Sequence, residues 1–193
     1  MIWSTSSFAF YFIEFYMNLL PIDNLYLLSC MIGLADMLGA GGFMAIIKCS
    51  SLKKALIGTF GALSISSVAL YVTMMGKTGD DVLSSGFTAA LFALVFTVRL
   101  CSGVSFAMAY YGTISVTPPV VLSTVFSLTN IACRFFTIFS PVISRVTTNP
   151  IIYVAVLGFV AFICSFFLNE DSRDIDLAAT KAGKEKDKSD KLT

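Results

Sequence analysis

Long apolar runs broken by short polar clusters constrain the fold of this 193-residue chain more than any other feature of its sequence. The runs are about 18–28 residues long, which is enough for a helix to cross a hydrocarbon core of ~30 Å. Only 13% of the residues are charged, whereas a soluble domain carries roughly 25%. The sequence therefore predicts an all-α fold, a polytopic membrane helix bundle whose main surroundings are the lipid bilayer.

Polar and proline-rich clusters divide the chain into six predicted transmembrane helices. The cluster at 21–24 ends the first segment, and Pro118 and Pro119 separate the fourth from the fifth, because proline forces the preceding residue out of helical geometry. The six segments span about 3–20, 25–47, 55–75, 83–112, 119–146 and 151–168. They form one transmembrane domain over 1–168. Residues 169–193 are charged and contain few apolar side chains, so we expect a disordered tail.

The distribution of basic residues predicts the orientation of the chain. The loop at 48–54 carries three lysines and the tail carries Arg173 and five lysines, whereas the opposite side has only Lys77 and Arg145. The positive-inside rule therefore places the N- and C-termini of this integral, multi-pass protein on the cytoplasmic or matrix side. Both the plasma membrane and the mitochondrial inner membrane fit this orientation.

Four ionisable residues lie inside the predicted spans: Glu14, Asp36, Arg99 and Arg134. A central arginine costs roughly 2.5–3.5 kcal/mol on membrane-insertion scales, so such residues face inward and find a partner or a water-filled cavity. Two interpretations follow. The two acids and two arginines form ion pairs that hold the bundle together, or at least one of them lines a substrate cavity.

Several function classes lack support in the sequence. The chain has no histidine, which removes the usual general base and the commonest transition-metal ligand, and it has no phosphate-binding loop or nucleophile elbow. The five cysteines are widely separated and follow no metal-binding spacing. A net charge of +1 gives no electrostatic case for nucleic acid. We therefore predict a protein that is not an enzyme and has no cofactor and no metal.

One stretch resembles a known family. Residues 130–141 read Asn-Ile-Ala-Cys-Arg-Phe-Phe-Thr-Ile-Phe-Ser-Pro. This is similar to the eleventh helix of the organic cation/anion transporter group (solute carrier family 22) of the major facilitator superfamily, which reads Ser-x-x-Arg-x-Gly-x-Ile-x-Ser-Pro in anion-transporting members. Further similarities are Arg99 in the tenth helix, Pro118 in the Glu-Leu-Tyr-Pro-Thr signature, Lys53-Lys54 after the eighth helix and Leu168-Asn169-Glu170 at the end of the twelfth. The chain thus resembles the C-terminal six-helix half of such a transporter.

The resemblance implies a role for the two arginines. Arg134 would contact the negative group of a small organic anion, and Arg99 would be a second candidate for substrate binding. Two departures concern a cytoplasmic charge network of the family: its signature glutamate is Ser115 here and a following arginine is Leu122. The first six helices of the family are also missing, and facilitator cavities form between two halves that rock about a midplane site.

Three hypotheses follow from this combination. In the first, the chain pairs with a second six-helix half, or with itself, and transports an organic anion. In the second, it is a half-transporter without transport activity, serving as a structural subunit among other membrane subunits, for example in an organelle membrane. The third hypothesis is that the missing half is encoded upstream in the same gene. In the structural case, Arg134 is predicted to form an ion pair with Asp36 or Glu14.

Overall fold

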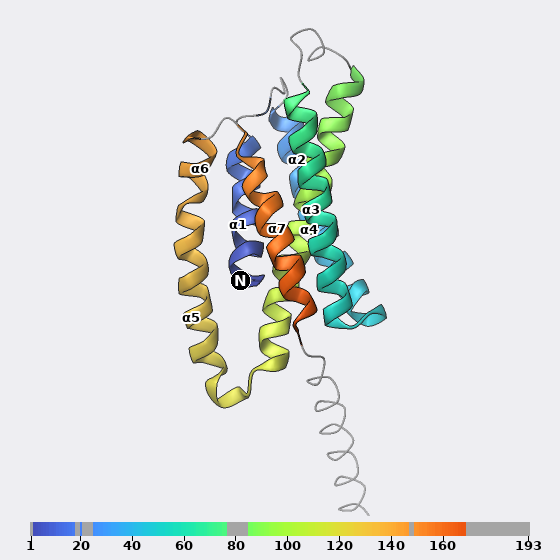
Figure 1. The fold of residues 1–193 in the computed structure, drawn as a ribbon. Helices are drawn as coiled ribbons and strands as arrows, with labels where there is room; N and C mark the ends of the chain where they lie inside the picture. The colour runs from blue at the N-terminus through green and yellow to red at the C-terminus, as the bar shows by residue number, and fades with distance from the viewer. Residues whose placement is uncertain (1, 18–19, 21–24, 77–84, 147–148, 169–193) are drawn as a thin grey trace, which may run out of the picture.

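The computed structural model describes residues 2–17, 20, 25–76, 85–146 and 149–168, and all regular structure in these ranges is helical. The helices run roughly along one axis and form an elongated bundle (Figure 1). Their bounds are α1 Ile2–Tyr16, α2 Leu25–Cys49, α3 Leu52–Met75, α4 Ser85–Val116, α5 Pro119–Ile138, α6 Ser140–Val146 and α7 Ile151–Phe166.

Helix α1 lies inside the bundle, where it packs against α4, α5, α6 and α7 (Figure 1). Its large side chains Phe8, Phe12 and Tyr16 are each at most 3% exposed. Its small polar residues are buried as well, and the Ser6 hydroxyl donates a hydrogen bond of 2.9 Å to the Ile2 carbonyl of its own helix. Because such internal bonds satisfy buried hydroxyls, α1 can serve as the core of the bundle despite its serine content.

Helices α3 and α7 approach each other closely at Gly158. The Ser64 hydroxyl of α3 donates to the Ala155 carbonyl of α7 at 3.3 Å. A Cβ atom built on Gly158 would lie 3.6 Å from the Ser64 Cα atom, which is ordinary van der Waals contact. Small residues permit such approaches between membrane helices. Gly158 therefore has room for a methyl group but not for a longer side chain.

The close approach at Gly158 predicts a size-dependent loss of stability. We expect Gly158→Ala to be tolerated, whereas Gly158→Leu should lower the free energy of unfolding by about 1–3 kcal/mol because it overpacks the α3–α7 contact. Thermal unfolding in detergent measures the difference. Gly58→Leu is the matched control, because a Cβ atom at Gly58 meets nothing within 4 Å. Equal melting temperatures for the two leucine variants would contradict the packing described here.

The prediction of six full-length spans is confirmed only in part. Within the described residues, four helical stretches are long and apolar enough to cross a membrane: 26–49, 52–75, 86–115 and 119–146. Helices α1 and α7 have only 15 and 16 residues. At 1.5 Å per residue they are roughly 22–24 Å long, which is shorter than the ~30 Å hydrocarbon core.

Several helix boundaries differ from the prediction by two to four residues, among them the end of α1 at Tyr16, the end of α2 at Cys49 and the start of α3 at Leu52. Two differences have a clear physical reason. The fourth segment continues to Val116 instead of ending at 112, because no helix breaker precedes Pro118. The fifth stretch is divided into α5 and α6 after Ile138, where Pro141 lacks the amide hydrogen that would bond four residues back. Figure 1 shows α5 and α6 following one another as nearly one rod. The predicted tail at 169–193 lies outside the described residues.

Candidate functional site

Arg99 of α4 is the best-buried charge of the described chain, with an exposed fraction of 1%. Its guanidinium meets the Asp36 carboxylate of α2 in a two-point contact: Nε lies 2.7 Å from Oδ1, and Nη2 lies 2.7 Å from Oδ2. Paired parallel bonds of this kind are among the strongest that side chains form. The contact fixes α2 against α4 near the middle of both helices.

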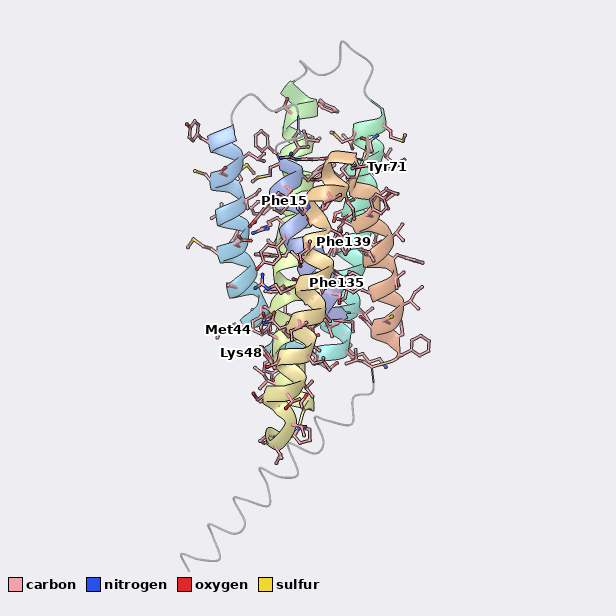
Figure 2. All side chains as sticks on the ribbon, turned by 90° about the vertical axis from the view of Figure 1, so that its left-hand side faces the viewer. Phe15, Met44, Lys48, Tyr71, Phe135 and Phe139 are labelled. Carbon is pink, nitrogen blue, oxygen red and sulfur yellow. The ribbon has the colours of Figure 1, made fainter. Side chains whose placement is uncertain are left out.

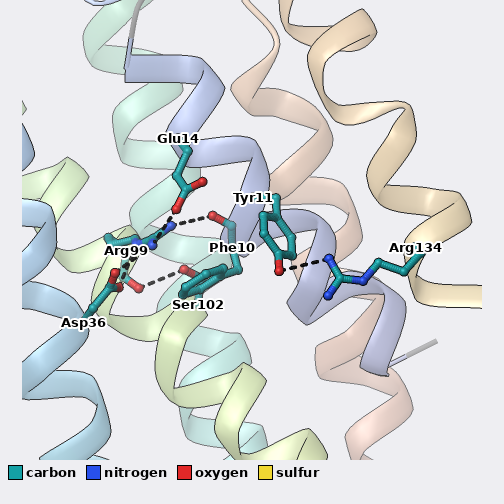
Figure 3. Close-up of polar contacts among 7 residues, drawn as sticks. All are labelled: Phe10, Tyr11, Glu14, Asp36, Arg99, Ser102 and Arg134. Carbon is teal, nitrogen blue, oxygen red and sulfur yellow. Dashed lines mark hydrogen bonds and ion pairs between the residues drawn. The ribbon is translucent and has the colours of Figure 1, made fainter. Parts of the chain in front are cut away.

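Helix α1 supplies the remaining partners of Arg99 (Figure 3). Arg99 Nη2 donates to Glu14 Oε1 at 3.1 Å, and Nη1 donates to the Phe10 carbonyl at 2.6 Å. The guanidinium carbon also lies 3.8 Å from the centre of the Phe10 ring, within cation–π range. We call Glu14, Asp36 and Arg99 the Arg99 cluster; it links α1, α2 and α4.

Two glycines lie near the Arg99 cluster. A Cβ atom on Gly39 of α2 would lie 3.7 Å from the Leu100 carbonyl oxygen, so the two helices meet almost backbone to backbone there. A Cβ atom on Gly103, one turn beyond Arg99, would lie 3.9 Å from Asp36 Oδ1. A methyl group would make ordinary van der Waals contact at both positions, so small residues there are compatible with the close approach of α2 and α4 at which Asp36 binds Arg99.

Arg134 lies on α5, near the middle of the apolar stretch 119–146, and is exposed. Its Nη1 atom donates to the Tyr11 hydroxyl at 3.1 Å, and its guanidinium carbon lies 5.3 Å from the centre of the Tyr11 ring. Both salt bridges found among the described residues belong to Arg99, so Arg134 has only a neutral partner there. Arg134 also borders an open groove of about 480 Å³, lined by Ser127, Asn130, Ile131, Arg134, Phe135 and Ile138.

The structure corrects the expected pairing of Arg134 with Asp36 or Glu14. Both carboxylates contact Arg99 instead. The physical reason is the position of α1, which lies between α2 and α5 in Figure 3 and presents Tyr11 to Arg134. The four charges that the sequence places inside the spans thus form one ion-paired cluster and one separate arginine.

Tyr11 and Phe10 were not predicted from the sequence, although both contact a predicted site residue. Tyr11 lies three residues before Glu14 on α1, but the two side chains contact different arginines, so this spacing does not indicate the contact between Tyr11 and Arg134. The Phe10 contact runs through its carbonyl oxygen and ring, and nothing in the sequence distinguishes this residue from the other phenylalanines.

The described part of the chain holds no group of three His, Cys, Asp or Glu residues placed to bind a metal ion. No protein-family model matches the chain, and no curated protein matches its sequence.

Proposed function

We propose that the chain is a membrane transport protein that moves a small organic anion, built like the C-terminal half of a major facilitator transporter. The observation that carries this proposal is the position of Arg134. Its cationic side chain is exposed near the middle of an apolar stretch, and its hydrogen-bond partner is the neutral Tyr11 hydroxyl. A charge at that depth needs a counter-charge or water. A carboxylate substrate supplies the counter-charge.

In this proposal Arg134 contacts the substrate and Arg99 positions helices. Arg99 already donates to two carboxylates and one carbonyl oxygen and is almost fully buried. An additional anion would therefore have to displace Glu14 or Asp36 to reach it. Arg134 keeps donor groups that a substrate can reach, since a guanidinium has five N–H donors and one of them is directed at Tyr11.

We further propose six membrane crossings, made by α1, α2, α3, α4, the α5–α6 stretch and α7. The packing of α1 against α4, α5, α6 and α7 supports its crossing despite its 15 residues, because a helix packed against several others does not have to match the lipid thickness alone. The lysines at 48, 53 and 54 support a cytoplasmic or matrix position for the α2–α3 connection, and hence for both termini.

The structural-subunit alternative is supported by one observation. Ser115 stands at the position of the signature glutamate, and its hydroxyl donates to the Gly112 carbonyl of its own helix at 3.1 Å. Ser115 thus supplies no charge to a cytoplasmic charge network of the kind that the family has. Native electrophoresis of mild-detergent extracts tests this alternative: migration in a much larger complex, together with absent transport, would favour it over our proposal.

Charge-selective uptake tests the proposed function. We expect liposomes that contain the full chain to accumulate radiolabelled benzoate at least tenfold faster than empty liposomes, because an anion gains an attractive contact with Arg134. Labelled tetraethylammonium should remain at the rate of empty liposomes. Benzoate uptake equal to that of empty liposomes would overturn the proposal.

A further inference from the structure

The residues around Arg99 and Arg134 form what we call the charged face: Tyr11 and Glu14 on α1, Asp36 on α2, Arg99 on α4 and Arg134 on α5 (Figure 3). The side chains of Glu14 and Asp36 remain 45% and 36% exposed beside the buried guanidinium of Arg99. Arg134 is exposed as well. Hydrocarbon is a costly neighbour for such groups, so the charged face requires a cover other than lipid.

The charges on this face are separated by sign. The Arg99 cluster holds two carboxylates and one guanidinium, which leaves a formal charge of −1. Arg134 contributes +1 on the other side of α1. Figure 3 shows the two groups at a similar height along the bundle, with α1 between them. Figure 2, seen from the side of α5, shows Phe15 of α1 between α2 and α5, the exposed Phe135 on α5 and the exposed Phe139 directly after α5.

We propose that a second copy of this chain covers the charged face, related to the first by a two-fold axis parallel to the bundle. A symmetric dimer uses the same surface on both subunits, so that surface must be complementary to itself. Rotation about this axis places Arg134 of each copy opposite the Glu14–Asp36 side of the other. The interface then contains two equivalent contacts between opposite charges.

The direction of the axis follows from the same charges. The alternative is a two-fold axis that lies in the plane of the face and runs perpendicular to the helices. It would place Arg134 against Arg134 and the acidic residues against each other, and like charges in contact disfavour an interface. The parallel axis also gives both copies the same orientation in the membrane, as one sequence with one distribution of basic loops requires. Glu14 can accept a further bond, since a carboxylate has about four acceptor positions and Arg99 uses one.

This inference rests on the membrane setting of the proposed function but does not depend on transport. It assigns the second half of the proposed transporter to a second copy of the same chain. The substrate site would then include Arg134 from each copy, and each arginine would be within reach of its partner's acids when substrate is absent. Substrate would compete with the carboxylates for the same guanidinium.

Förster energy transfer between donor- and acceptor-labelled full-length chains tests the proposal in phosphatidylcholine liposomes of low protein content. We expect the wild-type chain to associate and Arg134→Glu to reduce the association constant at least tenfold, because both equivalent contacts become repulsive. Arg145→Glu is the matched control. It changes another exposed arginine of the α5–α6 stretch, at the end of α6, and should leave association unchanged.

A mixture of two variants provides the sharper measurement. Arg134→Glu and Glu14→Lys should each fail to pair with themselves, because every homodimer contact joins like charges. A mixture of the two variants should restore energy transfer. In one contact of the mixed dimer the two introduced side chains, which have opposite charges, face each other. In the other contact the natural Glu14 of one variant meets the natural Arg134 of the other. Each variant is checked for folding by the protection of the buried thiols Cys101 and Cys133, and if Glu14→Lys fails this check the Arg134→Glu and Arg145→Glu comparison decides.

Two results would overturn the proposal: wild-type chains that show no energy transfer above a non-interacting membrane protein, or equal association of Arg134→Glu and Arg145→Glu. The first result would also indicate that a different partner covers the face. The outcome is separable from the proposed function, because association is measured without substrate. A chain that dimerises but does not take up benzoate would support this inference and contradict the proposed transport function. A chain that takes up benzoate but does not associate would contradict this inference and support transport.

Discussion

Replacing Asp36 by alanine is expected to lower the free energy of unfolding by about 3 kcal/mol. The substitution removes the two-point partner of Arg99 and leaves a guanidinium that is 1% exposed. Breaking a buried ion pair by deleting one partner costs roughly 3–5 kcal/mol. We place this case at the lower end, because Glu14 and the Phe10 carbonyl still bind the guanidinium and because the Asp36 side chain is 36% exposed.

The buried thiols of the chain provide the measurement. Cys101 and Cys133 are buried, so a thiol-reactive dye labels them only as the protein unfolds during heating in detergent. We expect Asp36→Ala to lower the melting temperature by about 6–12 °C, at 2–4 °C per kcal/mol for a chain of this size. Glu14→Gln is the control, because it removes one longer contact of 3.1 Å and should shift the midpoint much less. Equal midpoints for Asp36→Ala and the wild type would contradict the stabilising role of the Arg99 cluster.

Neutralising Arg134 is expected to have the largest effect on transport. In our proposal Arg134→Gln removes a charge-assisted hydrogen bond to the substrate, and such bonds contribute roughly 1.5–3 kcal/mol. At about 1.4 kcal/mol per tenfold, the apparent KM for benzoate uptake should rise ~10- to 100-fold. Arg134→Lys keeps the charge but loses the fork geometry, so its KM should lie between those of the wild type and Arg134→Gln.

Initial rates of benzoate uptake into liposomes, measured over a range of concentrations, give these KM values. Arg145→Gln is the matched control, because Arg145 is also an exposed arginine of the α5–α6 stretch but belongs to the last turn of α6. It should retain the wild-type KM. If Arg134→Gln transported benzoate as efficiently as Arg145→Gln, Arg134 would not be the anion contact.

The helical character of the chain was predictable, because apolar runs of bilayer length leave few other folds. Not every helix boundary was predictable from the sequence. The sequence contains Pro141, but a proline inside an apolar run either kinks a helix or ends it, and here the break follows Ile138. The short length of α1 could likewise not be predicted, because the apolar composition continues past Tyr16 to Leu20.

The four charges inside the predicted spans were found from the sequence, but their pairing was not. Counting charges gives two acids and two bases and suggests two ion pairs. The arrangement instead depends on how each helix is rotated about its axis. The helices α2 and α4 pack closely at Gly39 and Gly103, where Asp36 binds Arg99, and α1 presents Glu14 to Arg99 and Tyr11 to Arg134. No periodicity within one helix specifies such contacts between helices.

Chemical restoration of the charge at position 134 tests the central claim most directly. An Arg134→Cys variant, with Cys30 and Cys49 replaced by serine because both are exposed, would be treated with aminoethyl methanethiosulfonate, which adds a positive charge. We predict that benzoate uptake, measured below the wild-type KM, falls ~10- to 100-fold in the untreated variant and recovers after this treatment. A methyl reagent of similar reactivity, which adds no charge, should not restore it. Full uptake by the untreated variant, or equal recovery with both reagents, would contradict a role for the positive charge of Arg134 in anion transport.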